Sequence, residues 1–464
     1  MPAVHAVVLA AGKGTRMRSD SPKVVHRAAG RTLLDWVLEA TTAARADRTI
    51  VVVGHQADQV AASLPDGYEP VLQEPQNGTG HAVQVALSHL GDLDPDDTIL
   101  VTYGDMPLVS GRLYETLANR PSGTEAIITT VDPGPPGFGR VLRQPDGAVV
   151  GIVEERDCDA DQLKISERNV GLYAFAAGPL ARAIANLGRD NAQEELYLTD
   201  VIAHLVAAGD NVEVRKVDAA EVSGVNSHAD LAAVQAVLRR RINRQLMEDG
   251  VWMLDPDRTY VDATVTVEPG AFLYPGTHLQ GSSAVAAGAT VGPDALVVDS
   301  VIGAEATVIY SVLRGVEIGQ RAAVGPYASL RPGTVLLAGS KAGTFVEMKK
   351  TTLGEGAKVP HLAYMGDATI GARANVGAGT ITCNYDGYGK YETVIGERAF
   401  IGSDTMLVAP VTVGEGAVTG AGSVITEDVP PGSLAVERSQ QQEIPGYADR
   451  RAARQRAKDA EEGS

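Results

Sequence analysis

The 464-residue sequence contains little cysteine, few aromatic residues and no long apolar segment. Its two cysteines, Cys158 and Cys383, lie far apart and form no Cys-x-x-Cys pair, which argues against a disulfide framework and against a zinc cluster. The sequence has no run of about 18 apolar residues, which a membrane-spanning helix needs, and no cleavable signal segment. We therefore expect neither membrane insertion nor export, and a reducing cytoplasm fits these absences best.

Basic residues are also in the minority, with 40 Lys and Arg against 58 Asp and Glu and a net charge of −18. Because no long basic cluster occurs, neither a nucleic-acid partner nor an anionic membrane partner is expected, although local basic pockets can still bind small anions. The arginine run at 239–241 is interpreted as a solvated helix face. A chain of this length with 44% hydrophobic residues can bury more than one core, so two or more domains are expected.

Residues 1 to about 225 alternate β-rich runs with helical patterns. Four apolar runs are interpreted as buried strands: Val4–Leu9, Thr49–Gly54, Asp97–Asp105 and Glu125–Val131. Helical patterns at 33–44 and 80–90 separate the first three runs, which is typical of a doubly wound, mostly parallel sheet. Such sheets bind ligands at the carboxyl ends of their strands, where the loop after Leu9 and the pair Gly104 and Asp105 are expected.

An amphipathic helix is predicted at 227–250. Ser227 followed by Asp230 predicts its N-terminal cap, and Gly250 predicts its end. Its apolar face comprises Leu231, Val234, Leu238, Ile242 and Leu246. We interpret this segment as a connecting helix.

A six-residue repeat follows, with glycine and alanine between its aliphatic positions. These positions are Val261, Val267, Leu273, Leu279, Val285, Val291 and Val297 and, after a break, Ile395, Ile401, Leu407, Val413, Thr419 and Ile425. The period fits a coil of short parallel strands that stacks an aliphatic column inside, so chemistry must lie on its outer surface. Between about 338 and 394 the period breaks and Lys, His, Tyr and Asn are concentrated, so we expect a site in this interruption.

The loop "LAAGKGTRM" at Leu9–Met17 follows the first predicted strand. Its spacing fits neither a Walker A loop nor a dinucleotide fingerprint, which needs a third glycine where Met17 stands. Its small residues let backbone N–H groups close around a phosphate or a base edge, while Lys13, Arg16 and Lys23 supply positive charge. With "SPK" at 21–23, the loop resembles the signature of sugar-phosphate nucleotidyltransferases.

Further motifs follow in the order of one family. They are "QNGTGHAV" at 76–83, "YGDMPL" at 103–108, "GFGR" at 137–140, "IVEE" at 152–155, "NVGLYAF" at 169–175 and "SGVNSH" at 223–228. With the repeat half, they resemble the bifunctional N-acetylglucosamine-1-phosphate uridyltransferase and glucosamine-1-phosphate acetyltransferase family of bacteria. The expected architecture is a Rossmann-like, doubly wound α/β uridyltransferase domain at 1–226, a linker helix at 227–250, a left-handed parallel β-helix of hexapeptide repeats at 251–448 and a flexible tail at 449–464.

The resemblance implies that the first domain joins UTP to N-acetylglucosamine 1-phosphate and releases pyrophosphate. Asp105 and Asn226 would bind Mg²⁺, and Lys23, assisted by Arg16, would stabilise charge on the phosphates. The other positions implied to bind nucleotide or sugar are Leu9, Ala10, Ala11, Gly12, Gln73, Gly78, Thr79, Tyr103, Gly104, Gly139, Glu154 and Asn169. Considered singly, Asp105 and Asn226 could be turn residues and Lys23 a solvent-facing cation.

The repeat half contains "LRPGTVL", "FVEMKK", "KVPHLAYMGD", "ARANVGAGTITCNYDG" and "FIGSDT", which are similar to the family's acetyltransferase segments. The resemblance implies acetyl transfer from acetyl-CoA to the amine of glucosamine 1-phosphate, with His361 as the base. The implied sugar-phosphate contacts are Arg331, Lys349, Tyr364 and Asn375, and the implied acetyl-CoA contacts are Ala378, Asn384, Tyr385, Ser403, Ala421 and Arg438. Glu347 could tune His361 or Lys349, and Cys383 is expected to be a small buried residue rather than a nucleophile.

Two other interpretations stay open from the residues alone. In one, the chain carries out only nucleotidyl transfer and the repeat domain regulates or assembles it; in the other, the repeat domain is an oligomerisation scaffold and His361 a structural histidine. The resemblance implies a homotrimer through the β-helix with acetyl sites between subunits, so scaffolding and catalysis need not conflict. The tail keeps Arg438 but then departs from the family pattern, and 449–464 are expected to be a frayed helix or disordered.

Overall fold

The computed structural model describes residues 2–462, so the ends of the expected first domain and tail, at residues 1 and 463–464, lie outside the described part. The chain divides into two compact units, Met1–Glu248 with Tyr260–Val265, and Asp249–Thr259 with Thr266–Ser464. Within 2–462, no helix combines the length and apolarity needed to cross a membrane.

The first unit is built on a nine-stranded sheet with the order β11-β7-β10-β6-β1-β4-β5, and β8 and β9 extend it beside β10. Its strands are β1 (Val4–Leu9), β4 (Arg48–Val53), β5 (Glu69–Leu72), β6 (Thr98–Tyr103), β7 (Ala126–Val131), β8 (Arg140–Arg143), β9 (Val149–Val153), β10 (Arg168–Ala176) and β11 (Val212–Lys216). The four expected strands are confirmed as β1, β4, β6 and β7. β6, β1, β4 and β5 pair in parallel, whereas β10 is antiparallel to both β6 and β7.

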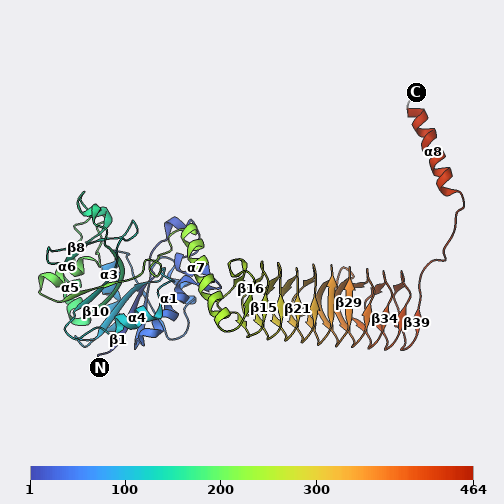
Figure 1. Ribbon diagram of the computed structural model, residues 1–464, viewed down its shortest axis with the longest axis horizontal. Coiled ribbons are helices and arrows are strands. Elements are labelled where there is room, and N and C mark those ends of the chain that lie inside the picture. Colours follow the sequence, from blue (N-terminus) through green and yellow to red (C-terminus); the bar gives the residue numbers. More distant parts are fainter. Residues whose placement is uncertain (1, 463–464) are drawn as a thin grey trace. The chain divides into compact units, whose positions relative to one another are not determined.

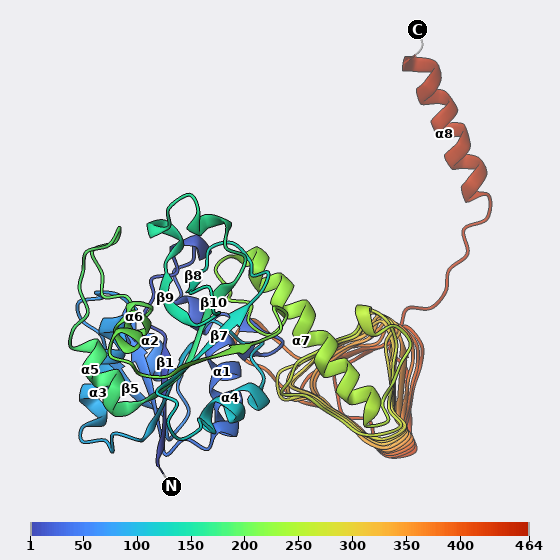
Figure 2. The same ribbon diagram turned by 60° about the vertical axis from the view of Figure 1, so that its left-hand side comes forward.

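Helices cover both faces of this sheet because its central strands are apolar on both sides (Figures 1 and 2). Val7 and Leu9 of β1 pack in one cluster with α3 (Thr79–Leu90), α5 (Ala177–Ile184) and α6 (Asp200–Ala207). Val8, which points to the other face, packs with α1 (Leu33–Thr41) and α2 (Ala57–Ala62). The cluster of α4 (Gly111–Ala118) contains Ala6 of β1. This arrangement confirms the Rossmann-like α/β fold.

The predicted connecting helix is α7 (His228–Glu248). Its cap has the expected reciprocal form, since the Asp230 N–H donates to Ser227 Oγ at 3.2 Å and the Ser227 N–H donates to the Asp230 carboxylate at 2.9 Å. Val234 and Leu238 are buried with Val225 and Met17. The remaining short strands of the first unit are β2 (Arg27–Ala28), β3 (Arg31–Thr32) and β13 (Tyr260–Val261).

The second unit is a coil of short strands in three rows, with a triangular cross-section (Figure 2). The first row comprises β12 (Trp252–Met253), β15 (Phe272–Leu273), β18 (Thr290–Val291), β21 (Thr307–Val308), β24 (Ala323–Val324), β27 (Lys341–Thr344), β29 (Lys358–His361), β31 (Asn375–Val376), β34 (Phe400–Ile401), β37 (Val418–Thr419) and β39 (Leu434–Ala435). The second row comprises β16 (His278–Gln280), β19 (Leu296–Val298), β22 (Val312–Arg314), β25 (Ser329–Leu330), β28 (Glu347–Leu353), β30 (Tyr364–Ile370), β32 (Ile381–Cys383), β35 (Met406–Val408) and β38 (Val424–Ile425). The third row comprises β14 (Thr266–Val267), β17 (Ala284–Val285), β20 (Val301–Ile302), β23 (Glu317–Ile318), β26 (Val335–Leu336), the second halves of β28 and β30, β33 (Thr393–Ile395) and β36 (Val411–Val413).

Strands in each row pair in parallel with the strand one turn away, as expected for a left-handed β-helix of hexapeptide repeats. The predicted aliphatic positions point inward; Leu273, Val291 and Ile401, for example, are fully buried. A separate helix, α8 (Tyr447–Glu462), follows the coil and buries none of its side chains.

One expectation about the coil is corrected. The scaffold is not interrupted throughout 338–394, because β27 to β32 continue the three rows and keep Met348, Leu353, Val359, Met365 and Ile370 inside. Successive inward residues of this stretch are five, six, six and five positions apart, so a strict six-residue count loses phase although the coil does not. Only residues 384–392, between β32 and β33, leave it.

Candidate functional site

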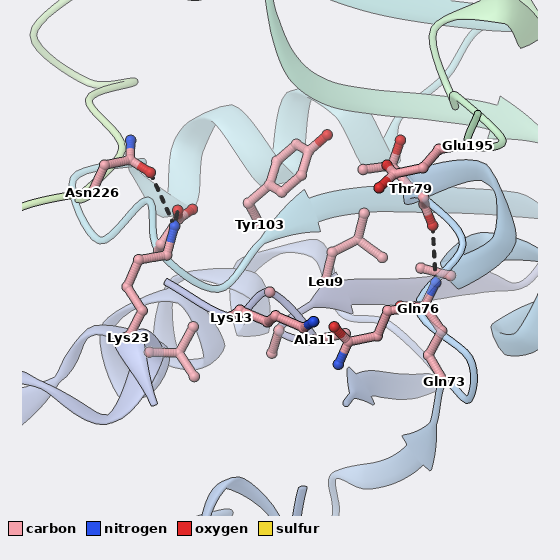
Figure 3. A pocket seen from close by; sticks show the side chains of 16 residues that line it. Leu9, Ala11, Lys13, Lys23, Gln73, Gln76, Thr79, Tyr103, Glu195 and Asn226 are labelled. Atoms are coloured by element: carbon pink, nitrogen blue, oxygen red, sulfur yellow. Dashed lines mark hydrogen bonds and ion pairs between the residues drawn. The ribbon is translucent and has the colours of Figure 1, made fainter. Parts of the chain in front are cut away.

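A cavity of about 560 Å³ opens at the carboxyl ends of β1 and β6 in the first unit (Figure 3). Most of the positions expected to bind nucleotide or metal line it: Leu9, Ala10, Ala11, Gly12, Lys23, Gln73, Gly78, Thr79, Tyr103, Asp105 and Asn226. These residues come from the ends of two parallel strands, the loop after β5, the start of α3 and the segment before α7. The structure therefore brings together side chains that are separated by more than 200 positions in the sequence, from Leu9 to Asn226.

Five expected residues do not line this cavity. Gly104 lies beside it, because its N–H donates to the Leu9 carbonyl at 3.0 Å. Glu154, Asn169 and Gly139 form an adjoining group, in which the Asn169 N–H donates to the Gly139 carbonyl at 2.9 Å. Arg16 is exposed on the short helix η1 (Thr15–Met17) and contributes nothing to the cavity wall.

The adjoining group is connected to the cavity through Tyr103. Burial, reinforced by the charges of Glu154 and Asp105, holds the pKa of the Tyr103 phenol well above its ordinary value. Burial also raises the pKa of Glu154, whose carboxylate accepts a hydrogen bond from Thr199 Oγ1 at 3.1 Å. A half-buried carboxylate that accepts a hydrogen bond from a hydroxyl is the kind of group that can recognise a sugar hydroxyl.

Two polar residues of the cavity wall, Gln76 and Glu195, were not among the expected ligands, whereas Lys13 was expected to supply positive charge there (Figure 3). Gln76 begins the quoted "QNGTGHAV" motif, so its position was a usable signal. Glu195 lies in a segment with no chemical pattern, and only the fold brings it to the cavity. Lys13 belongs to the glycine loop and adds a second ammonium to the wall.

Two glycines shape this cavity. Gly14 has a left-handed φ of 56°, and a Cβ there would lie 2.8 Å from the Cβ of Lys23. Gly78, with φ of 101°, precedes α3, and a Cβ there would lie 2.5 Å from the Leu196 carbonyl oxygen. These approaches hold the Lys23 loop against the glycine loop and the start of α3 against the segment that carries Glu195.

Lys23, Asp105 and Asn226 meet at one end of the cavity. The Lys23 ammonium contacts the Asp105 carboxylate. It also donates to Asn226 Oδ1 at 3.2 Å (Figure 3). The Lys23 side chain is 14% exposed and that of Asp105 is 15% exposed, so the ion pair is largely shielded from solvent. The Val225 N–H donates to the Asp105 carbonyl at 2.9 Å. This hydrogen bond holds the segment that carries Asn226 against the segment that carries Asp105.

The backbone at Asn226 is fixed by the start of α7. Its N–H donates to the Asp230 carboxylate at 3.0 Å, which also accepts the Ser227 N–H. His228 of α7 packs edge-on against His26, which follows the short helix η2 (Lys23–Val25), with ring centroids 5.8 Å apart. Burial and the neighbouring His228 lower the pKa of His26. The first turn of α7 therefore positions Asn226 and braces the Lys23 loop.

The oxygens at this end of the cavity fit a divalent cation of the magnesium type. Asp105 supplies a carboxylate oxygen and Asn226 an amide oxygen. Both oxygens contact the Lys23 ammonium, so they point toward the same positive charge. Within residues 2–462, no cluster of three or more His, Cys, Asp and Glu could hold a metal by itself. The pair suits Mg²⁺, which takes few protein oxygens and completes its shell with phosphates and water.

The second candidate site lies on one corner of the coil. His361 ends β29, and its exposed side chain stands directly before Leu362, whose φ is 48°. The corner continues along successive turns, because the N–H groups of Gly379, Asp404 and Gly422 donate to the carbonyls of Leu362, Ala378 and Ser403, respectively. The Arg438 guanidinium donates to the Ala421 carbonyl at 2.8 Å. The expected acetyl-CoA contacts Ala378, Ser403, Ala421 and Arg438 therefore follow one row from His361.

A cationic group forms on the neighbouring second row. Arg331 pairs with Glu347 at 3.0 Å, and Glu347 is in register with Tyr364 on the next turn. Lys390, from the segment that leaves the coil, and Arg331 lower the pKa of Lys349 by charge repulsion. Lys390 was not an expected ligand, because it lies 41 positions after Lys349 in the sequence and no local pattern shows that the two are close in space. Glu347 thus contacts Arg331, and no contact joins it to His361 in residues 2–462.

The remaining expected residues surround these two groups. The Asn384 amide donates to the Asp367 carboxylate at 2.5 Å, and Tyr385 is exposed, with its hydroxyl donating to the Gly387 carbonyl at 2.7 Å. Asn375 is in register with Lys358 of β29. Cys383 is half-buried, and burial raises the pKa of its thiol, which disfavours a nucleophilic thiolate.

The fold and the cavity define a nucleotidyltransferase unit that is joined to a hexapeptide-repeat transferase unit. Residues 6–210 match the family model described as MobA-like NTP transferase domain, and residues 392–427 match the one described as bacterial transferase hexapeptide (six repeats).

Full-length relatives are similar to both units. "Bifunctional protein GlmU" of Streptomyces avermitilis is 45% identical over 453 residues, which cover 96% of this chain and 94% of the relative. The protein of that name from Desulfitobacterium hafniense is 44% identical over 96% of this chain and 99% of its own length, and that from Kineococcus radiotolerans is 46% identical over 96% and 92%. The chain belongs to the bifunctional GlmU family of transferases.

Proposed function

We propose that this enzyme makes UDP-N-acetylglucosamine by two successive transfers, acetylation of glucosamine 1-phosphate in the second unit and uridylyl transfer in the first. Its substrates are acetyl-CoA, glucosamine 1-phosphate, N-acetylglucosamine 1-phosphate and UTP, with Mg²⁺ as the metal, and its place is the cytoplasm, where it supplies cell-envelope precursors such as those of peptidoglycan. The observation that carries the first half is the meeting of Lys23, Asp105 and Asn226 at the end of the cavity lined by the glycine loop.

In uridylyl transfer, a phosphate oxygen of the sugar phosphate attacks the α-phosphorus of UTP and pyrophosphate leaves. Joining two polyanions requires neutralised charge and alignment rather than covalent help from the protein. The backbone of Leu9 to Gly12 and Gln73, Gly78 and Thr79 hold the uridine, while the group around Glu154 and Asn169 holds the sugar. A divalent cation on Asp105 and Asn226 would supply charge neutralisation at the phosphates, and the Lys23 ammonium supplies the rest.

In acetyl transfer, the sugar amine attacks the thioester carbonyl, a C–N bond forms, and the C–S bond of acetyl-CoA breaks. His361 takes the proton that the amine loses, and the CoA sulfur leaves as a thiolate that is then protonated. Arg331, Lys349 and Lys390 form the cationic group that a sugar phosphate needs. Tyr364 and Asn375 orient the ring, and the row from Ala378 to Arg438 holds the CoA.

We also propose that the coil assembles as a homotrimer, with His361 at the boundary between copies. The apolar corner row, which we define as Tyr310, Tyr327, Phe345 and Leu362, occupies the same corner on four successive turns and is 40–62% exposed. All four residues have left-handed φ values of 46–61°, which cost about 1 kcal/mol or more for residues with a Cβ. A second copy that covers this row would offset that cost, and the row ends beside His361.

One assay tests both transfers together. The purified chain is given glucosamine 1-phosphate, acetyl-CoA, UTP and Mg²⁺, and free CoA and pyrophosphate are measured separately. We expect both products, with pyrophosphate appearing only after CoA. CoA without pyrophosphate would refute the uridylyl half, and pyrophosphate from added N-acetylglucosamine 1-phosphate without any CoA release would refute the acetyl half.

A further inference from the structure

The Lys23 ammonium stands where a divalent cation would be bound. It contacts the Asp105 carboxylate and lies 3.2 Å from Asn226 Oδ1, so it already uses the two oxygens that fit Mg²⁺. Mg²⁺ binds oxygen at about 2.0–2.1 Å, so a cation on this pair would occupy the space of the ammonium. Two positive charges at hydrogen-bond separation also repel each other strongly in a shielded site.

We propose that the Lys23 ammonium and the divalent cation exclude each other from the oxygens of Asp105 and Asn226, so that Lys23 must leave this pair before metal is bound. This inference rests on the proposed uridylyl transfer and adds a step to it. Lys23 acts as a built-in counterion of the metal pair in the nucleotide-free enzyme. It then moves to the nucleotide phosphates as the cation takes its place.

The number of protein ligands explains why metal alone would compete poorly. Asp105 and Asn226 provide one carboxylate and one amide, and no acidic cluster in residues 2–462 reinforces them. A tethered lysine therefore competes well against a free cation that gains only two protein oxygens. A nucleoside triphosphate changes this balance, since its phosphates give the metal further oxygens and give Lys23 a new anionic partner.

The surrounding structure permits this exchange without movement of the backbone. The metal pair is fixed by the Val225–Asp105 backbone hydrogen bond and by the capped start of α7. Lys23, in contrast, is an unbranched side chain that faces the open volume of the cavity, so rotation about its own bonds is sufficient for it to change partners.

Direct binding of Mn²⁺ alone, followed by electron paramagnetic resonance at constant pH and without nucleotide, tests the exchange. Lys23→Met removes the competing ammonium, so we expect it to bind Mn²⁺ about tenfold more tightly than the unaltered enzyme, the scale of one charge-assisted hydrogen bond. Lys13→Met is the matched control, because it removes an ammonium from the same cavity wall that no contact joins to Asp105 in the described chain. We expect it to change Mn²⁺ affinity by less than about threefold. Asp105→Asn added to Lys23→Met should abolish the gain.

Equal affinities of the Lys23→Met and unaltered enzymes would overturn the proposal, as would the absence of Mn²⁺ binding to Lys23→Met at millimolar concentration. An equal gain in Lys13→Met would also overturn it, because general electrostatics would then explain the effect. Should Lys23→Met fail to fold by circular dichroism, acylation of the unaltered enzyme decides. Mn²⁺ raised until its binding to Asp105 and Asn226 is saturated should increase modification of Lys23 relative to Lys13, and no increase at saturation would refute the exchange. The proposed function fails separately, if Asp105→Asn leaves uridylyl transfer intact.

Discussion

The two candidate sites differ in how the chain encloses them. The first is a cavity of about 560 Å³ whose walls come from residues 9 to 226 of one unit. The second is a row on the outside of a repeating coil, where His361, Tyr385 and Leu362 are all exposed. A doubly wound sheet creates a crevice where its strands end, whereas a filled coil offers only surface. The first site can therefore be complete within one chain, while the second, under the proposed assembly, gains a further wall from another copy of the chain.

The largest expected effect is the loss of one activity without loss of the other. Asp105→Asn should lower uridylyl transfer by about 10²–10³, because it removes the carboxylate that is proposed to hold the divalent cation at the phosphates. His361→Ala should lower acetyl transfer by about 10²–10⁴, the range of a lost general base. Each variant should retain the other activity, as measured by separate pyrophosphate and CoA assays. If either substitution stopped both reactions in a folded protein, the two-site assignment would be wrong.

The next prediction concerns the missing wall of the second site. Phe345→Glu places a charge in the apolar corner row, so we expect self-association to be lost by light scattering and acetyl transfer to fall at least about tenfold. Uridylyl transfer should remain, because the cavity is formed within one unit. Val301→Glu is the control, since Val301 is similarly exposed at 49% but lies on the third row of the coil, away from that corner. If Phe345→Glu self-associates as the unaltered protein does, the apolar corner row does not form the interface between copies.

A smaller effect is expected from the glycines of the first site. Gly78→Ala should lower the free energy of unfolding of the first unit by about 2 kcal/mol, because φ is 101° and the new Cβ would meet the Leu196 carbonyl. Gly12→Ala should change it by less than about 0.5 kcal/mol, since no atom lies within 4 Å of its Cβ position. Gly12→Ala should instead raise the KM for UTP. Denaturant unfolding and steady-state kinetics on both variants test this contrast, which equal stabilities would contradict.

The smallest effect concerns an ion pair that serves neither site. The Arg48 guanidinium, with a contribution from His89, lowers the pKa of Glu69 to about 2. A lowered carboxyl pKa contributes stability that is present above the unfolded value of about 4.5 and is lost as pH falls toward 2. Glu69→Gln should therefore lower stability at pH 7 by less than about 1 kcal/mol, because the pair is partly exposed. Thermal melts should show this difference shrinking in acid, and a difference that grew in acid would contradict the assignment.

The sequence predicted the parts of the fold that repeat or alternate. The strands β1, β4, β6 and β7 and the inward column of the coil follow from local periodicity. The antiparallel β10 could not be predicted, because nothing in its apolar run, 168–176, specifies its direction. Likewise, no local pattern marks Glu195 or Lys390, because only the folding of the chain brings them to the two sites. Arg16 was assigned to the first site from its motif, although its exposed side chain lies outside the cavity.

The backbone ladder of the second unit has a consequence for how such a coil can change in length. Corner carbonyls such as those of Leu362, Ala378 and Ser403 accept from the next turn, and inward residues such as Leu279 and Val297 lie above one another. One residue inserted within a strand would therefore turn the side chains that follow it in that strand to the wrong side of the wall, unless the next corner absorbs it. Whole turns can be added or lost without that penalty. The length of the coil should therefore differ between natural or engineered variants by whole turns, each about 4.8 Å long. In all of them we expect His361 to stay on the same corner.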